Sequence, residues 1–143
     1  MERSLILVKP DAVTRGLSGA ILNRIEASGL KMVAVKMLHI DPELAARHYA
    51  AHREKPFFAG LIAYITSAPV IAAVFEGNDA VGRIRTLMGP TDPAKAEPGT
   101  LRRDFGTDIE RNAIHGSDSA ETAEKEINLF FDKHNIVHYE RTR

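Results

Sequence analysis

The sequence contains no cysteine among its 143 residues, which excludes disulfide bonds and thiolate metal sites and is typical of a reducing compartment. Neither sign of charge is in excess, because 19 lysines and arginines balance 19 aspartates and glutamates. This balance removes any general attraction to nucleic acids or membrane surfaces. The apolar run Leu5–Val8 is too short for a signal-peptide core or a membrane span. We therefore expect a soluble, cytoplasmic protein without a membrane partner.

Glycine-rich phosphate loops are also missing, since neither GxxxxGK[ST] nor GxGxxG occurs in the chain. Any phosphate chemistry must therefore rely on side chains. Metal-ligand spacing is nearly absent too. His48 and His52 lie four residues apart on an expected helix, but no third ligand is near them in sequence, and such a pair is more often incidental. We predict no metal site held by the protein itself.

Hydrophobic residues make up 44% of the chain and charged residues 27%, proportions that are ordinary for a globular protein. The length suits one domain over residues 1–143 with a core of its own. Residues 5–8 and 70–75 are continuously apolar, which predicts two strands that are buried on both faces. Residues 30–40 predict a strand with one more polar side.

The remaining elements complete a βαββαβ order. Apolar spacing, caps and glycine or proline stops predict helices at residues 17–28, from 41 onward, at 57–65, at 80–88 and at about 118–132, with a short strand at 113–114. We predict a ferredoxin-like α+β fold, an antiparallel sheet with the first and third strands in the centre and helices covering one face. A long loop, about 89–112, precedes the last strand. A loop of this length is usually either functional or disordered, and both alternatives remain open here.

In the stretch from Ile114 to Ser119, His115 comes directly before a glycine at which the chain can turn. Three residues that favour helix N-caps follow this glycine. Asp118 and Glu121 have the spacing of a capping box. His115 is then expected just ahead of a helix N-terminus, where phosphate is favoured. The alternative is that His115 only packs at the end of a strand, and this stretch alone favours that alternative.

Other candidates are individually weak. Lys9, Arg85 and Arg102 lie at element ends or in the long loop and suit phosphate binding, although a single basic residue is usually a solvated surface charge. Phe57 follows a proline at a helix start, where it either stacks on a nucleobase or joins the core. Glu126 or Glu124 could orient His115, and the sequence does not choose between them.

Taken together, these residues resemble one family. The motif Asn112-x-x-His115-Gly116-Ser117-Asp118-Ser119, combined with the segment Val8–Val13, resembles nucleoside diphosphate kinase. The family's other segments occur in order and spacing, namely His48-Tyr49, Lys55–Leu61, Gly89–Pro93 and Gly99–Arg102. The resemblance covers essentially the whole chain.

The resemblance implies a ping-pong reaction in which a nucleoside triphosphate, usually ATP, phosphorylates His115, and a nucleoside diphosphate then accepts the phosphoryl group. It implies that Lys9 and Asn112 contact the ribose 3′-hydroxyl and that Phe57 stacks on the base with broad base tolerance. The phosphates would be held by Arg85, Thr91 and Arg102, with Mg²⁺ bound through them. Tyr49 would lie near the transferred phosphoryl group, and Ser117 and Glu126 would hydrogen-bond around His115. Relatives form homo-oligomers, so we expect a tetramer or a hexamer.

A second class of function is a non-catalytic nucleotide- or nucleic-acid-binding module on a ferredoxin-like fold. Such modules usually carry paired aromatic residues on exposed strands. The expected strands offer Phe75 but no such pair, and the net charge is zero. We therefore rank this alternative second and expect no specific nucleic-acid partner.

Overall fold

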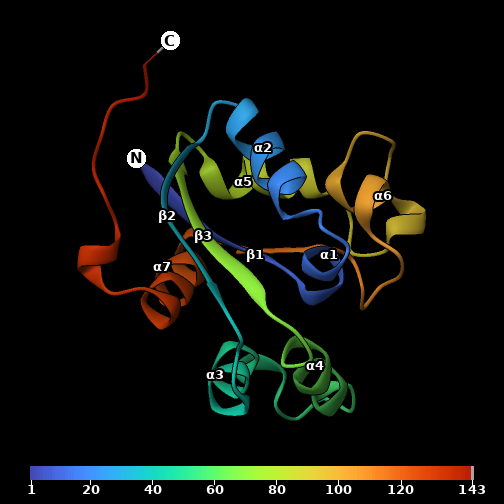
Figure 1. Cartoon of the computed structure of the whole chain (residues 1–143). Coiled ribbons are helices and arrows are strands. Elements are labelled where there is room, and N and C mark those ends of the chain that lie inside the picture. Colours follow the sequence, from blue (N-terminus) through green and yellow to red (C-terminus); the bar gives the residue numbers. More distant parts are fainter. Residues whose placement is uncertain (143) are drawn as a thin grey trace.

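The computed structural model describes residues 1–142 and is organised around a four-stranded antiparallel sheet. The strands are β1 (Glu2–Val8), β2 (Lys31–Leu38), β3 (Val70–Gly77) and β4 (Ile114–Gly116), in the order β2-β3-β1-β4 (Figure 1). The two continuously apolar strands, β1 and β3, form the centre, as the sequence predicted. The ferredoxin-like α+β fold is confirmed.

The register of the sheet positions the candidate histidine. Leu7 in the middle of the sheet pairs with Ala72 on one side and with His115 on the other. Lys9 follows β1 directly, and its backbone N–H donates to the carbonyl of Ala113. The carboxyl end of β1 and the start of β4 therefore bring Lys9 and His115 into the same region.

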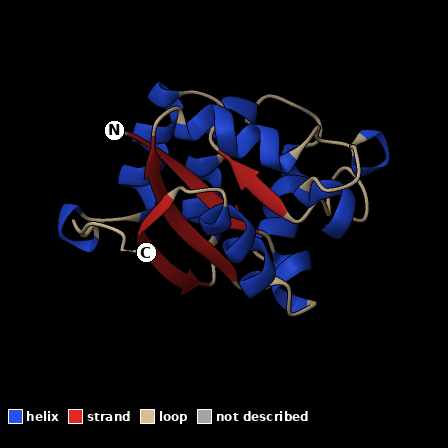
Figure 2. Cartoon of the chain, turned by 90° about the horizontal axis from the view of Figure 1, so that it is seen from above, coloured by secondary structure: helices blue, strands red, loops and turns tan. Residues whose placement is uncertain are grey.

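Helices cover both faces of the sheet, not one as expected. Ile6 and Val8 belong to a core cluster with side chains of α2 (Ser18–Ala27) and α5 (Ala80–Met88). Leu5 and Leu7, on the opposite face, pack with α3 (Pro42–His48), α4 (Phe58–Ile65) and α7 (Ala120–Phe130). In Figure 1, α2 and α5 lie above the sheet and α3 and α7 below it. Seen from above, the strands cross the molecule diagonally between helices (Figure 2). A strand that is apolar on both sides needs apolar cover on both sides.

Three short helical segments lie where the sequence has no periodic apolar pattern. Helix α1 (Pro10–Thr14) begins at the proline that ends β1. The stretch expected as a long loop contains the 3₁₀ helix η2 (Pro93–Lys95) and helix α6 (Leu101–Phe105). Side chains of Asp92 and Thr100 cap these two segments by accepting backbone N–H groups. Segments of one turn are too short to show an apolar period.

The start of α7 corrects the predicted capping box. Ser119, and not Asp118, is the N-cap residue, and its hydroxyl accepts the backbone N–H of Thr122 at 3.0 Å. Ser119 is extended (φ −156°, ψ 165°), so the helix begins one residue later than expected. Glu121 then occupies the second helical position, which is one residue short of a capping-box partner.

The remaining short segments are the 3₁₀ helices η1 (Ala50–His52) and η3 (Lys133–Asn135). Beyond η3 the chain runs beside β2, where the backbone N–H of Val137 donates to the carbonyl of Val33 at 2.9 Å. Within residues 1–142, no helix has the length and apolar character needed to cross a membrane.

Candidate active site

A cleft of about 390 Å³ opens where α3, α5, α6, β4 and α7 meet. Six of the predicted site residues line it, namely Tyr49, Arg85, Thr91, Arg102, His115 and Glu126. The side chain of His115 is 25% exposed. The chain therefore presents a partly accessible imidazole in a cleft with two arginines, rather than a histidine packed away at the end of a strand.

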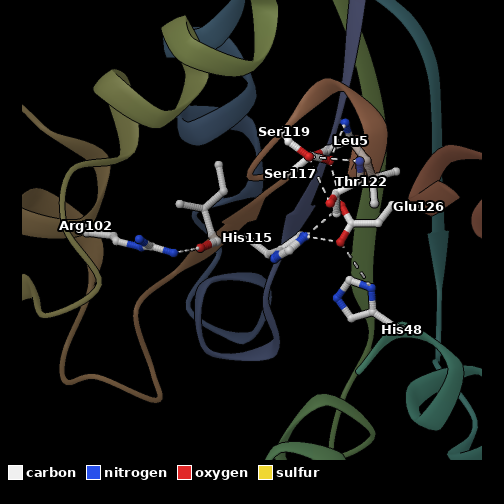
Figure 3. A network of polar contacts seen from close by, with 9 residues as sticks. Leu5, His48, Arg102, His115, Ser117, Ser119, Thr122 and Glu126 are labelled. Atoms are coloured by element: carbon white, nitrogen blue, oxygen red, sulfur yellow. Dashed lines mark hydrogen bonds and ion pairs between the residues drawn. The ribbon is translucent and has the colours of Figure 1, made fainter. Parts of the chain in front are cut away.

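A carboxylate holds one ring nitrogen of His115. Its Nε2 atom lies 3.1 Å from Oε1 and 3.0 Å from Oε2 of Glu126, whose Oε1 also accepts the hydroxyl of Ser117 at 2.6 Å (Figure 3). Burial alone would raise the pKa of the Glu126 carboxyl, but the hydrogen bonds from His115 and Ser117, with the nearby imidazole charge, hold this pKa below its ordinary value. Between the two glutamates that the sequence left open, the structure places Glu126 against His115.

This contact assigns the proton of the imidazole. An ionised carboxylate only accepts hydrogen bonds, so Nε2 of a neutral His115 carries the hydrogen. The lone pair is then on Nδ1. Ser117 holds the carboxylate in place and is itself bound to β1. Its backbone N–H donates to the Leu5 carbonyl, and its hydroxyl accepts the Leu5 N–H at 3.3 Å. Strand β1 thus anchors the partner of the histidine.

Two buried cations lie near the cleft. Lys9 Nζ donates to the carbonyl of Glu110 at 2.8 Å and to Oδ1 of Asn112 at 2.9 Å, and burial lowers its pKa to about 8. The guanidinium of Arg102 donates to the carbonyls of Gly89 and Ile114. Burial, followed by the charge of Arg85, lowers the pKa of Arg102 to about 10. Both cations also fasten the 89–112 segment beside β4.

A strained turn connects Asn112 to His115. Ala113 has φ +75°, and the N–H of Ile114 donates to the carbonyl of Asn112 at 2.9 Å, which closes a γ-turn. A carboxylate oxygen of Asp11 accepts the N–H of Ala113 at 3.1 Å, and its other oxygen accepts the hydroxyl of Tyr64. Sequence reasoning missed the role of Asp11, because the pairing joins positions 102 residues apart. A positive φ at a non-glycine residue is costly and persists only where surrounding contacts impose it.

His48 is the second residue that sequence reasoning missed. Its side chain is 1% exposed, and its ring meets that of His115 edge-on with centroids 4.7 Å apart. Its Nδ1 atom lies 3.8 Å from Oε2 of Glu126. Burial, followed by the nearby charge of His115, lowers the pKa of His48 to about 3, so the ring stays neutral. Sequence reasoning considered His48 only as a partner of His52 on the same helix and as part of the His48-Tyr49 segment, so it missed the contact with His115.

Phe57 lies at the N-cap of α4 and is 50% exposed. Its ring centroid is 5.6 Å from that of His52, which lines the cleft. Phe57 is therefore not a core residue and presents an apolar surface beside the cleft. Phe75, the aromatic that an exposed nucleic-acid-binding sheet would need, is instead fully buried, and helices cover both faces of the sheet.

The residues of the cleft fit a magnesium ion that is bound through phosphates. Mg²⁺ prefers oxygen ligands, and it is often held by one or two carboxylates together with substrate phosphates. The carboxylates lining the cleft are Asp118 and Glu126, and Glu126 is already engaged by His115 and Ser117. The cleft therefore offers cations for phosphates and at most Asp118 for the metal.

The chain resembles known proteins over its whole length. The family model for nucleoside diphosphate kinase matches residues 2–136. A nucleoside diphosphate kinase of Dehalococcoides mccartyi is 60% identical over 141 residues, covering 99% of both chains. One from Archaeoglobus fulgidus is 56% identical over 141 residues and covers 99% of this chain and 93% of its own.

Solved structures agree with this resemblance. The nucleoside diphosphate kinase of Halobacterium salinarum in complex with CDP superposes with a TM-score of 0.95 at 53% identity, covering 98% of this chain and 93% of its own. The enzyme of Aquifex aeolicus gives a TM-score of 0.93 at 47% identity, covering 95% and 99%. With the cleft, its imidazole and its cations, these relationships show that the chain belongs to the nucleoside diphosphate kinase family and transfers phosphoryl groups between nucleotides.

Proposed function

We propose that His115 carries the phosphoryl group in a ping-pong exchange between a nucleoside triphosphate, typically ATP, and a nucleoside diphosphate. The observation that carries this proposal is the pairing of Nε2 with the carboxylate of Glu126 at 3.0 Å. It leaves the Nδ1 lone pair as the nucleophile, in a cleft that Arg85 and Arg102 also line. Phosphoryl transfer depends mainly on such positioning and on charge neutralisation.

In the first half-reaction, Nδ1 bonds to the γ-phosphorus, and the bond to the β–γ bridging oxygen breaks. The nucleoside diphosphate leaves with the electrons of that bond. The imidazole becomes positively charged, and Glu126 stabilises it through the retained Nε2–H bond. In the second half-reaction, a terminal oxygen of another nucleoside diphosphate attacks the phosphorus, and Nδ1 recovers its lone pair. Ser117 keeps the carboxylate in place throughout.

The nucleotide would lie between the cations and the exposed aromatic. We assign the phosphates to Arg85, Thr91 and Arg102, and the ribose 3′-hydroxyl to Lys9 and Asn112, whose side chains already bond to each other. Phe57 would stack on the base without reading its edges, which predicts broad base tolerance. The CDP complex of a relative supports a site that accepts a pyrimidine nucleotide.

Tyr49 would lie near the transferred phosphoryl group. Burial, followed by the charge of Glu126, raises its pKa to about 12, so its hydroxyl stays protonated and can donate a hydrogen bond. Mg²⁺, bound through the phosphates, would neutralise part of their charge. The chain's own cationic side chains would neutralise the remaining phosphate charge.

We propose that the protein acts in the cytoplasm as a homo-oligomer, a tetramer or hexamer of one-domain subunits. The absence of cysteine supports the compartment. Strand β2 is at the edge of the sheet, and beyond Val33, where the C-terminal segment bonds to it, the strand exposes Val35 by 51% and Met37 by 61%. An edge strand with exposed apolar side chains favours pairing with a second copy of the chain.

The decisive experiment is phosphoenzyme formation. Incubation with γ-labelled ATP should give a labelled protein whose label is lost in acid and retained in base, and which discharges when a nucleoside diphosphate is added. His115→Ala should remove the label, whereas His134→Ala, at an exposed histidine near the C-terminus, should keep it. Equal labelling of the unsubstituted protein and His115→Ala would refute the proposal.

A further inference from the structure

We propose that His48, His115 and Glu126 form a binding site for a borderline divalent transition metal, with Zn²⁺ as the best fit, and that the bound metal silences the nucleophile. One nitrogen from each histidine and one carboxylate oxygen lie within 4.8 Å of one another. These ligands come from α3, β4 and α7. Because the three residues are far apart in sequence, no metal-binding sequence motif indicates the site. The inhibitory part of this proposal rests on the proposed role of His115.

The separations fit a tetrahedral ion. With metal–ligand bonds of about 2.0–2.2 Å, neighbouring ligand atoms of a tetrahedral zinc site lie roughly 3.3–3.6 Å apart. Here Nε2 of His115 is 3.0 Å and Nδ1 of His48 is 3.8 Å from the same oxygen, Oε2 of Glu126. Small side-chain shifts would bring all three atoms to one ion. The fourth position would face the cleft, which all three residues line.

His48 is an independent sign of a ligand site. Its side chain is 1% exposed, and within residues 1–142 neither of its ring nitrogens has a hydrogen-bond partner. Buried polar groups are normally paired, and an unpaired one calls for an explanation. A neutral imidazole is also the form that binds metals. With its hydrogen on Nε2, His48 can present the lone pair of Nδ1 to an ion beside the carboxylate.

The surroundings resemble those of a metal ligand set. Ser117 donates to Oε1 of Glu126 at 2.6 Å, which leaves Oε2 for the ion and fixes the orientation of the carboxylate. Such outer contacts tune metal ligands. Two imidazoles and one carboxylate favour Zn²⁺ over Mg²⁺, which prefers oxygen ligands. The positive charges of Lys9 and Arg102 work against a cation, so we expect a moderate affinity that suits inhibition more than a permanent structural metal.

Metal binding and phosphorylation would oppose each other through the two nitrogens of one ring. The metal takes the lone pair of Nε2, so the hydrogen that Nε2 carried must move to Nδ1. A neutral imidazole has one N–H, and the exchange therefore releases no net proton. Nδ1 then has no lone pair with which to attack phosphorus. Conversely, the metal could bind phosphorylated His115 only by displacing the hydrogen on Nε2, with release of a proton, so phosphorylation weakens metal binding.

The test is a titration of the nucleotide-free enzyme with Co²⁺, which reports four-coordinate binding by strong visible absorption. We expect a saturable band that one equivalent of Zn²⁺ abolishes. Loss of an outer contact typically costs about 10–100-fold in metal affinity, so we expect His48→Gln, which removes a direct ligand, to weaken binding by at least that factor. His52→Gln and His134→Gln should bind as the unsubstituted enzyme does. Equal affinity in His48→Gln, or only the weak absorption of six-coordinate Co²⁺, would overturn the site.

A second measurement uses the unsubstituted enzyme and so does not depend on the folding of a variant. Enzyme phosphorylated with ATP and freed of nucleotide should bind Co²⁺ more weakly and give a weaker cobalt band, and discharge by a nucleoside diphosphate should restore it. A band of equal strength in the phosphorylated enzyme would overturn the opposition between metal binding and phosphorylation. Failure to form any phosphoenzyme would refute the proposed function instead, while the cobalt band and its loss in His48→Gln would still support the metal site.

Discussion

Nε2 of His115 lies 3.0 Å from Oε2 of Glu126, a residue 11 positions further along the chain and on a different element. The contact determines which nitrogen of the imidazole carries the hydrogen and which has the lone pair. Glu124, two residues earlier on the same helix, makes no such contact. The chain therefore offers a matched pair of glutamates with which to test the assignment.

Glu126→Gln should slow phosphoenzyme formation by roughly 10²-fold or more, since replacing the carboxylate of a Ser-His-Asp triad by an amide costs about 10⁴ through the wrong histidine tautomer. The amide also fails to stabilise the charged ring. Rapid-quench measurement of labelling by γ-labelled ATP gives the rate. Glu124→Gln should retain the rate of the unsubstituted enzyme, and a comparable loss in both variants would contradict the role of Glu126.

Phe57→Ala should raise the KM for purine and pyrimidine nucleotides alike. Stacking of a base on an aromatic side chain is worth about 1–3 kcal/mol, which corresponds to roughly 5- to 150-fold. The rate of the chemical step should change little, because the lost contact is remote from the phosphorus and is made equally before and during transfer. Steady-state kinetics with several nucleoside diphosphates tests this, with Phe57→Tyr as the control that keeps the ring. Unchanged KM values would place the base elsewhere.

The lowered pKa of Lys9 predicts that nucleotide capture depends on pH. Its pKa is about 8, so the ammonium loses its proton as pH rises through that value. Because kcat/KM reports the free enzyme, its profile should fall above about pH 8. Lys9→Gln should have a lower kcat/KM without that fall. A fall of the same midpoint in the variant would assign it to another group.

The lowered pKa of Lys9 also makes stability depend on pH. Here the effect has the opposite direction, because the free energy of unfolding rises with pH whereas kcat/KM falls. Burial lowers the pKa of Lys9 in the folded state, so the unfolded chain binds more protons between about pH 8 and the ordinary lysine value of 10.5. The contribution of Lys9 to the free energy of unfolding therefore rises with pH across that window, and it is constant below the window, where both states hold the proton. Urea denaturation of the unsubstituted protein and Lys9→Met at pH 8 and pH 10 measures the difference. The unsubstituted protein should gain relative to the variant.

Ser119→Ala should lower the free energy of unfolding by about 1 kcal/mol, the usual cost of losing an N-cap side chain. In high salt, Asp118→Ala should lower the free energy of unfolding by less than Ser119→Ala does. Asp118 contributes only an attraction to the helix N-terminus, and salt screens this attraction. Urea denaturation in the same buffer compares the two. A larger loss for Asp118→Ala would restore Asp118 as the cap of α7.

Several features were readable from the sequence because they depend on neighbouring residues. The continuously apolar strands β1 and β3 indicated the centre of the sheet. Asp41 followed by Pro42 indicated the start of α3, and the side chain of Asp41 does accept the N–H of Leu44. The motif around His115 predicted a candidate nucleophile through its resemblance to a known family, and the structure places this residue in the cleft. Each signal is local, either a period, a cap or a short motif.

Only the tertiary structure decided which distant residues meet. It selected Glu126 over Glu124, turned His48 toward His115, and used Asp11 to hold the strained Ala113. It also covered both faces of the sheet with helices. These outcomes depend on strand register and on how whole helices pack, and a side chain's own neighbours in sequence do not encode the rotation of the helix that carries it.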